Sequence, residues 1–254
     1  MGFLRLEGID EYGLDDPLRT VKHREIILSK PFLKRLYLEW YTTIKNYIQD
    51  VPTGKLVELG SGGGFLKEVI PDVVTSDILP IPGNDMVFDA LAMPFEDESI
   101  SAFLMVDVFH HVPDSKQFLS EMYRTLKVGG KIVMNEPWNS FWGRFIYKNF
   151  HHETFNPQGD WKIPSSGPMS DANGALPYIV FLRDLERFKQ EFPGFEIQVL
   201  KRHTPLRYLL SGGVSMKALV PAFSYGLLSG FEKLVSPFSK SFSMFVTIVV
   251  KKVS

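Results

Sequence analysis

Short apolar runs that end in polar or glycine-containing turns alternate along the chain with segments whose apolar residues recur at helical spacing. Five such runs precede residue 138, and we predict them as strands: 55–60, 73–77, 86–90, 100–109 and 131–136. Regular alternation of strands and helices is typical of a mostly parallel sheet covered on both faces. The pattern therefore indicates an α/β protein.

The helical segments carry apolar side chains three and four positions apart. Residues 21–50 mix apolar and charged positions at this spacing and are interrupted near Pro31, so two helices are expected there. Residues 115–127 have a clear apolar face and stop at the Gly129–Gly130 pair, and 182–192 reads as a further helix.

The second half of the chain is less regular. We expect residues 138–178 to be a long irregular segment, which in a compact domain often has a function. Residues 195–202 and 243–252 are predicted as a sixth and a seventh strand, and the segment 205–240 between them is apolar with Gly, Ser and Pro interspersed. Since no parallel crossover pattern joins these two strands, we expect an antiparallel edge.

Composition narrows the classes of function. The 254 residues carry a formal net charge of −1, which disfavours binding to a nucleic-acid backbone through bulk charge. The absence of cysteine excludes thiolate metal sites and cysteine nucleophiles, and suits the cytoplasm. No signal-peptide pattern or run of about 18 apolar residues is present, so no membrane-spanning helix is expected.

A glycine-rich turn follows the first predicted strand. Its glycines at 60, 62 and 64 form a GxGxG pattern, and Phe65 stands where the dinucleotide fingerprint GxGxxG needs its third glycine. Asp77, Asp89 and the His110–His111 pair follow the next three strands. Because ligands bind at the carboxyl ends of strands in open α/β sheets, these residues are expected to share one crevice.

These pieces together resemble the class I S-adenosylmethionine (SAM)-dependent methyltransferases, specifically the methyltransferase type 11 family. The matching segments are ELGSGGG, the strand end at Asp77, DALAMPFEDES, VFHHV and EMYRTLKVGGKIVMNEP, which span roughly residues 55–137. Two departures, Ser101–Ala102 and Val128, fall where no contact with the cofactor is expected.

The resemblance implies SAM as cofactor and a Rossmann-like sheet of seven mostly parallel strands. It places Glu58 near the SAM amino group, the glycines under the methionine and ribose, Asp77 on the ribose hydroxyls, and Asp89 with Ala90 at the adenine edge. Met93 and Phe95 are expected in the adenine pocket. The full predicted cofactor set is Glu58, Gly60, Ser61, Gly62, Gly64, Asp77, Ile78, Asp89, Ala90, Met93 and Val106.

His110 and His111 are the predicted catalytic residues, as a base or as a clamp on the acceptor; the alternative is that one imidazole only packs and bonds to the backbone. His151, His152 and Glu153, with Asp160 nearby, form a candidate metal cluster. We expect no metal there, because adjacent histidines in a strand or loop usually point apart.

The acceptor side is expected to come from 18–50, 138–178 and 205–240. Its predicted binding residues are Trp40, Trp138, His151 and Asn173. Looser similarity of the flanks to type 11 relatives associated with bacterial polysaccharides suggests a small-molecule acceptor, such as a sugar or a lipid-linked glycan. Contact of 205–240 with a membrane is the less favoured alternative, because Pro221 and Gly226 interrupt a long amphipathic helix.

The chain is predicted to be one methyltransferase domain. Within 1–254, residues 1–50 form an N-terminal helical cap, 51–137 the SAM-binding core, 138–181 an acceptor-side insertion, and 182–254 the rest of the sheet. The competing function is a non-catalytic partner subunit with the same fold. The sequence does not specify the acceptor atom or the oligomeric state.

Overall fold

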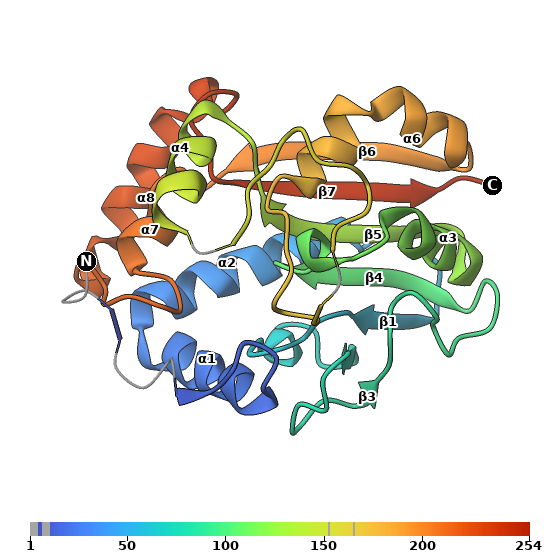
Figure 1. Ribbon diagram of the computed structural model, residues 1–254, viewed down its shortest axis with the longest axis horizontal. Coiled ribbons are helices and arrows are strands. Elements are labelled where there is room, and N and C mark those ends of the chain that lie inside the picture. Colours follow the sequence, from blue (N-terminus) through green and yellow to red (C-terminus); the bar gives the residue numbers. More distant parts are fainter. Residues whose placement is uncertain (1–4, 7–10, 152, 165) are drawn as a thin grey trace.

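A computed structural model describes residues 5–6, 11–151, 153–164 and 166–254 (Figure 1). Seven strands form one sheet in the order β3-β2-β1-β4-β5-β7-β6. They are β1 (Lys55–Glu58), β2 (Val74–Asp77), β3 (Met86–Val87), β4 (Ile100–Val106), β5 (Leu126–Pro137), β6 (Phe195–His203) and β7 (Phe245–Lys252). The strands from β3 to β5 are parallel to one another, whereas β7 is antiparallel to both of its neighbours, β5 and β6. The predicted mostly parallel sheet with an antiparallel edge is confirmed.

The central strands are apolar along almost their whole length because both faces of the sheet are covered. Six of the seven residues of β4 are buried, and so is every residue of β5 from Gly130 to Pro137. Parallel strands covered on both sides lose the polar alternation of a strand that faces water on one side.

Helices surround the sheet (Figure 1). The α-helices are α1 (Pro17–Ser29), α2 (Pro31–Tyr47), α3 (Ser115–Thr125), α4 (Phe141–Phe150), α5 (Leu176–Tyr178), α6 (Leu185–Glu191), α7 (Arg207–Ser211) and α8 (Tyr225–Leu234). Shorter turns are η3 (Leu66–Glu68), η4 (Phe109–His111), the π-helical η5 (Ile179–Arg183), η6 (Ala222–Ser224) and η7 (Ser236–Phe238). Among the described residues, no helix is long and apolar enough to span a bilayer.

Local chemistry sets the helix boundaries near the start of the chain. The side chain of Asp16 accepts the backbone N–H of Leu18 at the start of α1, and Pro31 occupies the first position of α2. Proline suits the first turn of a helix, where its missing N–H would have no intrahelical partner. The predicted break near Pro31 is therefore confirmed.

One local prediction needs correction. The segment 138–178 contains the ten-residue helix α4, which begins at Ser140, whose hydroxyl accepts the N–H of Gly143. Its exposed residues include Phe141, Phe145 and Phe150 beside Arg144 and Lys148, so aromatic residues on the solvent side obscured the helical pattern in the sequence. After the glycine loop, the chain forms only the three-residue 3-10 turn η3.

A buried arginine joins the apolar segment 205–240 to the N-terminal helices. The guanidinium of Arg207 donates to Glu232 at 2.5 Å, to both carboxylate oxygens of Glu39 at 2.7 and 2.8 Å, and to the hydroxyl of Tyr225 at 2.7 Å. These four residues link α7, α8 and α2. Glu232 also accepts the backbone N–H groups of Leu206 and Arg207, so both of its oxygens have donors.

We predict that Arg207→Ala lowers the free energy of unfolding by about 3–5 kcal/mol, because it leaves the buried carboxylate of Glu232 without its cation. Urea unfolding followed by circular dichroism measures the change. Lys189→Ala is the matched control: it removes an exposed ion pair with Glu186 and should cost less than about 1 kcal/mol. Equal effects of the two substitutions would contradict the importance of the Arg207 network.

Candidate functional site

One cavity of about 510 Å³ lies at the carboxyl ends of β1, β2 and β4. Its walls include Glu58 from β1, the glycine loop, Asp77 from β2, and residues 106–113 after β4. The strand order reverses between β1 and β4, and this switch point is where open α/β sheets bind ligands. The predicted crevice is therefore present as a single cavity.

The glycine loop approaches its neighbours too closely for side chains. Gly60 has a φ of +57°, and a Cβ added there would lie 2.6 Å from the side chain of Val108. A Cβ at Gly63 would lie 2.8 Å from the backbone nitrogen of Arg24, so α1 passes directly over the loop. The guanidinium of Arg24 in turn donates to the carbonyl of Gly64 at 2.8 Å. The glycines at 60, 62, 63 and 64 thus leave bare backbone at this wall of the cavity.

Glu58 is a buried acid beneath the glycine loop that lines the cavity. Burial raises the pKa of Glu58 to about 8, partly opposed by a hydrogen bond from Ser61. Its Oε2 is buried and has no hydrogen-bond partner among the described residues. A buried oxygen of this kind is costly unless a donor reaches it, so the position fits a ligand with an amino group.

Asp77 braces the loop and also faces the cavity. Its Oδ2 accepts the N–H of Gly62 at 3.0 Å, and its Oδ1 accepts that of Leu79 at 3.0 Å. Burial raises the pKa of Asp77, and these backbone hydrogen bonds oppose the rise. Each oxygen keeps a second lone pair, so the carboxylate can accept a ligand hydroxyl as well.

Most of the predicted cofactor set lines the cavity together. These residues are Glu58, Gly60, Ser61, Gly62, Gly64, Asp77, Ile78, Asp89, Ala90 and Val106. Met93 and Phe95 are the exceptions and require correction: both are buried in the core and do not line the cavity. Phe88 and Leu91, which follow β3, line it instead. Which residues touch a cofactor stays a prediction.

The two predicted catalytic histidines sit on η4, directly after β4. A carboxylate at the end of β5 fixes this turn: Glu136, which is fully buried, accepts the N–H groups of Val108 and Phe109 through Oε1 at 2.9 and 2.8 Å. Its Oε2 lies 2.8 Å from Nδ1 of His110. Nδ1 of His111 lies 3.0 Å from the carbonyl oxygen of Asp171.

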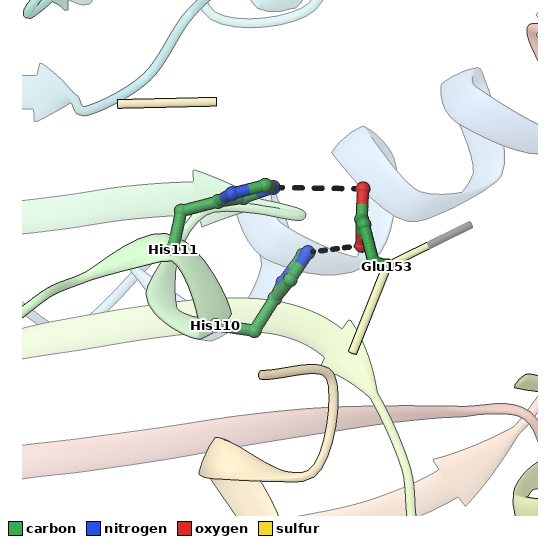
Figure 2. A group of neighbouring side chains, drawn as sticks. All are labelled: His110, His111 and Glu153. Carbon is green, nitrogen blue, oxygen red and sulfur yellow. Dashed lines mark ion pairs between the residues drawn. The ribbon is translucent and has the colours of Figure 1, made fainter. Parts of the chain in front are cut away.

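Both imidazoles face Glu153, which follows α4 (Figure 2). Nε2 of His110 is 3.3 Å from one carboxylate oxygen of Glu153, and Nε2 of His111 is 3.8 Å from the other. Burial opposes a charge on His110, but hydrogen bonds with Glu136 and Glu153 outweigh it and hold the pKa of His110 well above its usual value. Burial lowers the pKa of His111 to about 4.

The structure corrects most of the predicted acceptor residues. His151 lines the cavity, but Trp40, Trp138 and Asn173 do not. Trp40 packs on Phe245 and Tyr208, and Trp138 is a core residue with an exposed fraction of 1%. Asn173 is buried and bonds the backbone at Asn156. His152 lies outside the described residues, so the candidate cluster of 151–153 is not seen in full.

Sequence reasoning missed several cavity residues. Asp107 has a positive φ of 57°, lies at the end of β4, and burial raises its pKa to about 8. Its position after a buried strand was the available signal. Tyr37, Tyr147 and Tyr208 give the cavity an aromatic wall, and they come from α2, α4 and α7. No local pattern distinguishes these tyrosines from core residues.

Comparisons with known proteins agree with this geometry. A family model described as a methyltransferase domain matches residues 57–134. A demethylmenaquinone methyltransferase of Symbiobacterium thermophilum is 27% identical over 152 residues, which cover 58% of this chain and 57% of that protein. A phthiotriol/phenolphthiotriol dimycocerosates methyltransferase of Mycobacterium ulcerans is 40% identical over 57 residues, 22% of this chain and 21% of that protein. The chain thus matches little more than half of the first of these relatives.

Solved structures share the fold. A SAM-dependent methyltransferase of Thermotoga maritima has a TM-score of 0.54 and 21% identity, covering 85% of this chain and 89% of that one. Geranyl diphosphate C-methyltransferase of Streptomyces coelicolor has a TM-score of 0.51 and 16% identity, covering 98% and 89%. Residues 57–134 thus match a methyltransferase domain, and the sheet order and the strand-end crevice agree with that match.

Proposed function

We propose that this chain transfers a methyl group from SAM to a small-molecule acceptor held in the same cavity. The observation that carries the proposal is the continuity of that cavity. It joins the glycine loop, Glu58 and Asp77 at one end to His110, His111 and Glu153 at the other. A cofactor and an acceptor bound in this cavity can therefore contact each other directly, with no protein wall between them.

The residues around the glycine loop suit the parts of SAM. The unpartnered Oε2 of Glu58 would accept the amino group, and Asp77 would accept the ribose hydroxyls. Asp89 and Ala90 lie where the adenine edge is expected. SAM supplies a methyl group already activated by a positively charged sulfur, so the protein's main tasks are to align the acceptor and to exclude water.

The acceptor end of the cavity combines an aromatic wall with a polar cluster. Tyr147, Tyr208 and Phe245 offer apolar surface, while His110, His111 and Glu153 offer hydrogen-bonding groups. We propose an acceptor with an apolar body and one hydroxyl or amine, which the histidines and Glu153 would hold toward the cofactor. The names of the relatives, which include a demethylmenaquinone methyltransferase and a geranyl diphosphate C-methyltransferase, support the apolar body of the acceptor.

The sugar or lipid-linked glycan acceptor is less well supported. The flat side chains proposed to stack on a sugar, Trp40 and Trp138, lie in the core. A lipid-linked glycan has an apolar lipid chain that could provide the proposed apolar body, so it stays among the acceptors to be tested. Nucleic acid stays outside the proposed class, since the net charge of −1 gives no bulk attraction to phosphates.

A transfer assay with radiolabelled SAM tests the function. The purified protein is incubated with fractionated small-molecule and lipid extracts, and labelled products are identified by mass spectrometry. We expect label in an apolar fraction. Asp77→Ala should weaken binding of S-adenosylhomocysteine at least about tenfold, because a hydrogen bond to a carboxylate is lost. Asp97→Ala, an exposed carboxylate outside the cavity, is the matched control.

Two outcomes would contradict the proposal. Unchanged binding of S-adenosylhomocysteine by the Asp77→Ala variant would show that the cofactor lies elsewhere. Tight cofactor binding without transfer to any fraction would favour the alternative, a non-catalytic partner subunit.

Protonation of Glu58 should make cofactor binding depend on pH. The free protein carries a neutral Glu58 below about pH 8, whereas an ammonium group prefers the ionised carboxylate. We therefore predict that affinity for S-adenosylhomocysteine rises roughly tenfold from pH 6.5 to pH 8. Isothermal titration at several pH values measures this slope, and Glu58→Gln should abolish it.

Glu58 should also make the free energy of unfolding depend on pH, in the opposite direction to cofactor affinity. Unfolded Glu58 is ionised above its ordinary pKa of 4.5, whereas the folded protein holds a proton there up to about pH 8. Stability without ligand should therefore fall as pH rises through this window, and Glu58→Gln should reduce the fall. A variant that leaves both the binding slope and the unfolding profile unchanged would show that Glu58 is not the titrating group.

A further inference from the structure

His110, His111 and Glu153 have the donor set and the surroundings of a metal site. The ligand atoms that these three side chains offer lie within 4.8 Å of one another. Ligands around a first-row metal ion lie about 2.0–2.2 Å from the ion, which places them roughly 3–3.5 Å apart. The separation of 3.3 Å between His110 and Glu153 already falls in this range, and that of 3.8 Å between His111 and Glu153 is close to it.

The partners of the two Nδ1 atoms fix how each ring is protonated. Nδ1 of His111 faces a backbone carbonyl, which only accepts, so this nitrogen carries a hydrogen. Nδ1 of His110 faces Glu136, whose other oxygen is engaged by two backbone N–H groups. A carboxylate or a carbonyl behind Nδ1 is the usual support of a metal-binding histidine.

In the neutral form, this arrangement turns two Nε2 lone pairs toward a carboxylate (Figure 2). Lone pairs that face a carboxylate repel it unless a cation lies between them. A proton on Nε2 of His110 removes the repulsion between that nitrogen and Glu153. A metal ion between the three side chains would bind both Nε2 atoms and the carboxylate at once. We propose that His110, His111 and Glu153 bind a divalent first-row metal ion, such as Zn²⁺, with open coordination positions toward the cavity.

This set differs from the cluster considered from the sequence. That cluster was expected to fail because adjacent histidines point apart in strands and loops. On the 3-10 turn η4 they do not: the ring centroids of His110 and His111 lie only 4.3 Å apart. The site itself is independent of the proposed function. Only its role, which is to hold an oxygen or nitrogen atom of the acceptor, rests on that function.

Binding of Co²⁺ and Zn²⁺ to the chelator-treated protein tests the site. We expect one ion per chain, a Co²⁺ absorption spectrum typical of nitrogen and oxygen ligands, and displacement of Co²⁺ by Zn²⁺. His111→Ala and Glu153→Gln should each weaken binding at least tenfold, whereas His23→Ala, at another histidine of the cavity wall, should leave it unchanged. Circular dichroism verifies that each variant is folded.

Equal affinity of the wild type and of the folded His111→Ala and Glu153→Gln variants would overturn the metal proposal, as would a wild type that binds neither ion. Titration of S-adenosylhomocysteine into the same proteins separates this failure from a failure of the proposed function. Cofactor binding that survives while metal binding is absent would refute the metal site alone.

A separate observation concerns an exposed apolar ridge formed by Phe223, Leu227, Phe231, Leu234 and Phe238. These residues follow one another at intervals of four, four, three and four, so they share one face of the segment from η6 through α8 to η7. Four of the five have exposed fractions of 70–89%, and Phe231 has 45%. Tyr225 and Glu232 are buried on the opposite side.

Helix α4 adds apolar surface beside this ridge. The backbone N–H of Trp142 bonds the carbonyl of Ser241, and the Trp142 ring lies 5.3 Å from that of Phe242. Phe141 and Phe145 are exposed on the same helix. Figure 1 places α4, α7 and α8 together at one end of the molecule.

The exposed charges of α4 and of the segment 205–244 are all positive, and the exposed carboxylate next to them, Glu39 of α2, is paired with Arg207. The positive charges are Arg144 and Lys148 on α4, and Lys217, Lys233 and Lys240 in the segment 205–244. The acid of that segment, Glu232, is buried against Arg207. Exposed aromatic and leucine side chains among basic residues are typical of helices that lie in the interface of an anionic membrane.

We infer that the apolar ridge and α4 dock this protein on an anionic lipid surface. In the structure, α8 continues through Gly226 and Pro221 lies before η6, so neither residue interrupts the apolar ridge. Sedimentation with phosphatidylglycerol–phosphatidylcholine vesicles should recover the protein in the pellet, and much less of it with phosphatidylcholine alone.

The double variant Leu227→Ser/Leu234→Ser should lower vesicle binding at least tenfold, and Val128→Ser, an exposed apolar residue near the far end of β5, should not. Failure of the wild type to bind anionic vesicles would overturn the inference. So would a dimer in solution that the double variant dissolves, because the ridge would then be an interface between two copies.

Discussion

The buried carboxylate of Glu136 determines how the chain leaves the centre of the sheet. Its two oxygens bind the backbone of Val108 and Phe109 and the ring of His110, all within 2.9 Å. A buried carboxylate deprived of these donors would be penalised by several kcal/mol, so the end of β5 and the turn after β4 hold each other in place. This turn, η4, carries His110 and His111, which both line the cavity. The position of the two imidazoles therefore depends on Glu136.

The other end of the cavity depends on close approach of backbone segments. Gly60 lies against Val108, Gly63 lies against α1, and Asp77 binds the N–H of Gly62. These contacts leave no room for side chains over the loop, while Glu58 stays buried beneath it with one oxygen unpartnered. A ligand amine would therefore be recognised by a group that the protein alone leaves unsatisfied.

The helices outside the sheet connect the cavity to the rest of the surface. α2 contributes Tyr37 to the cavity wall and Glu39 to the buried Arg207 network. Through Arg207, this network holds α7 and α8, which carry Tyr208 in the cavity and the apolar ridge on the outside. The aromatic cavity wall and the surface proposed to dock on lipid are thus joined through the Arg207 network.

The sequence by itself determined the sheet, the glycine loop and the strand-end carboxylates. Each of these leaves a local pattern: buried strands are short apolar runs, Pro31 starts a helix, and ligand groups follow strands. Only the tertiary structure brought Glu153 to the histidines, because no periodicity links residues more than 40 positions apart. It also placed Trp40 and Trp138 in the core and the phenylalanines of α4 and α8 in solvent. Aromatic residues have the same spacing in both environments, and whether an aromatic face is covered depends on neighbours that the local sequence does not specify.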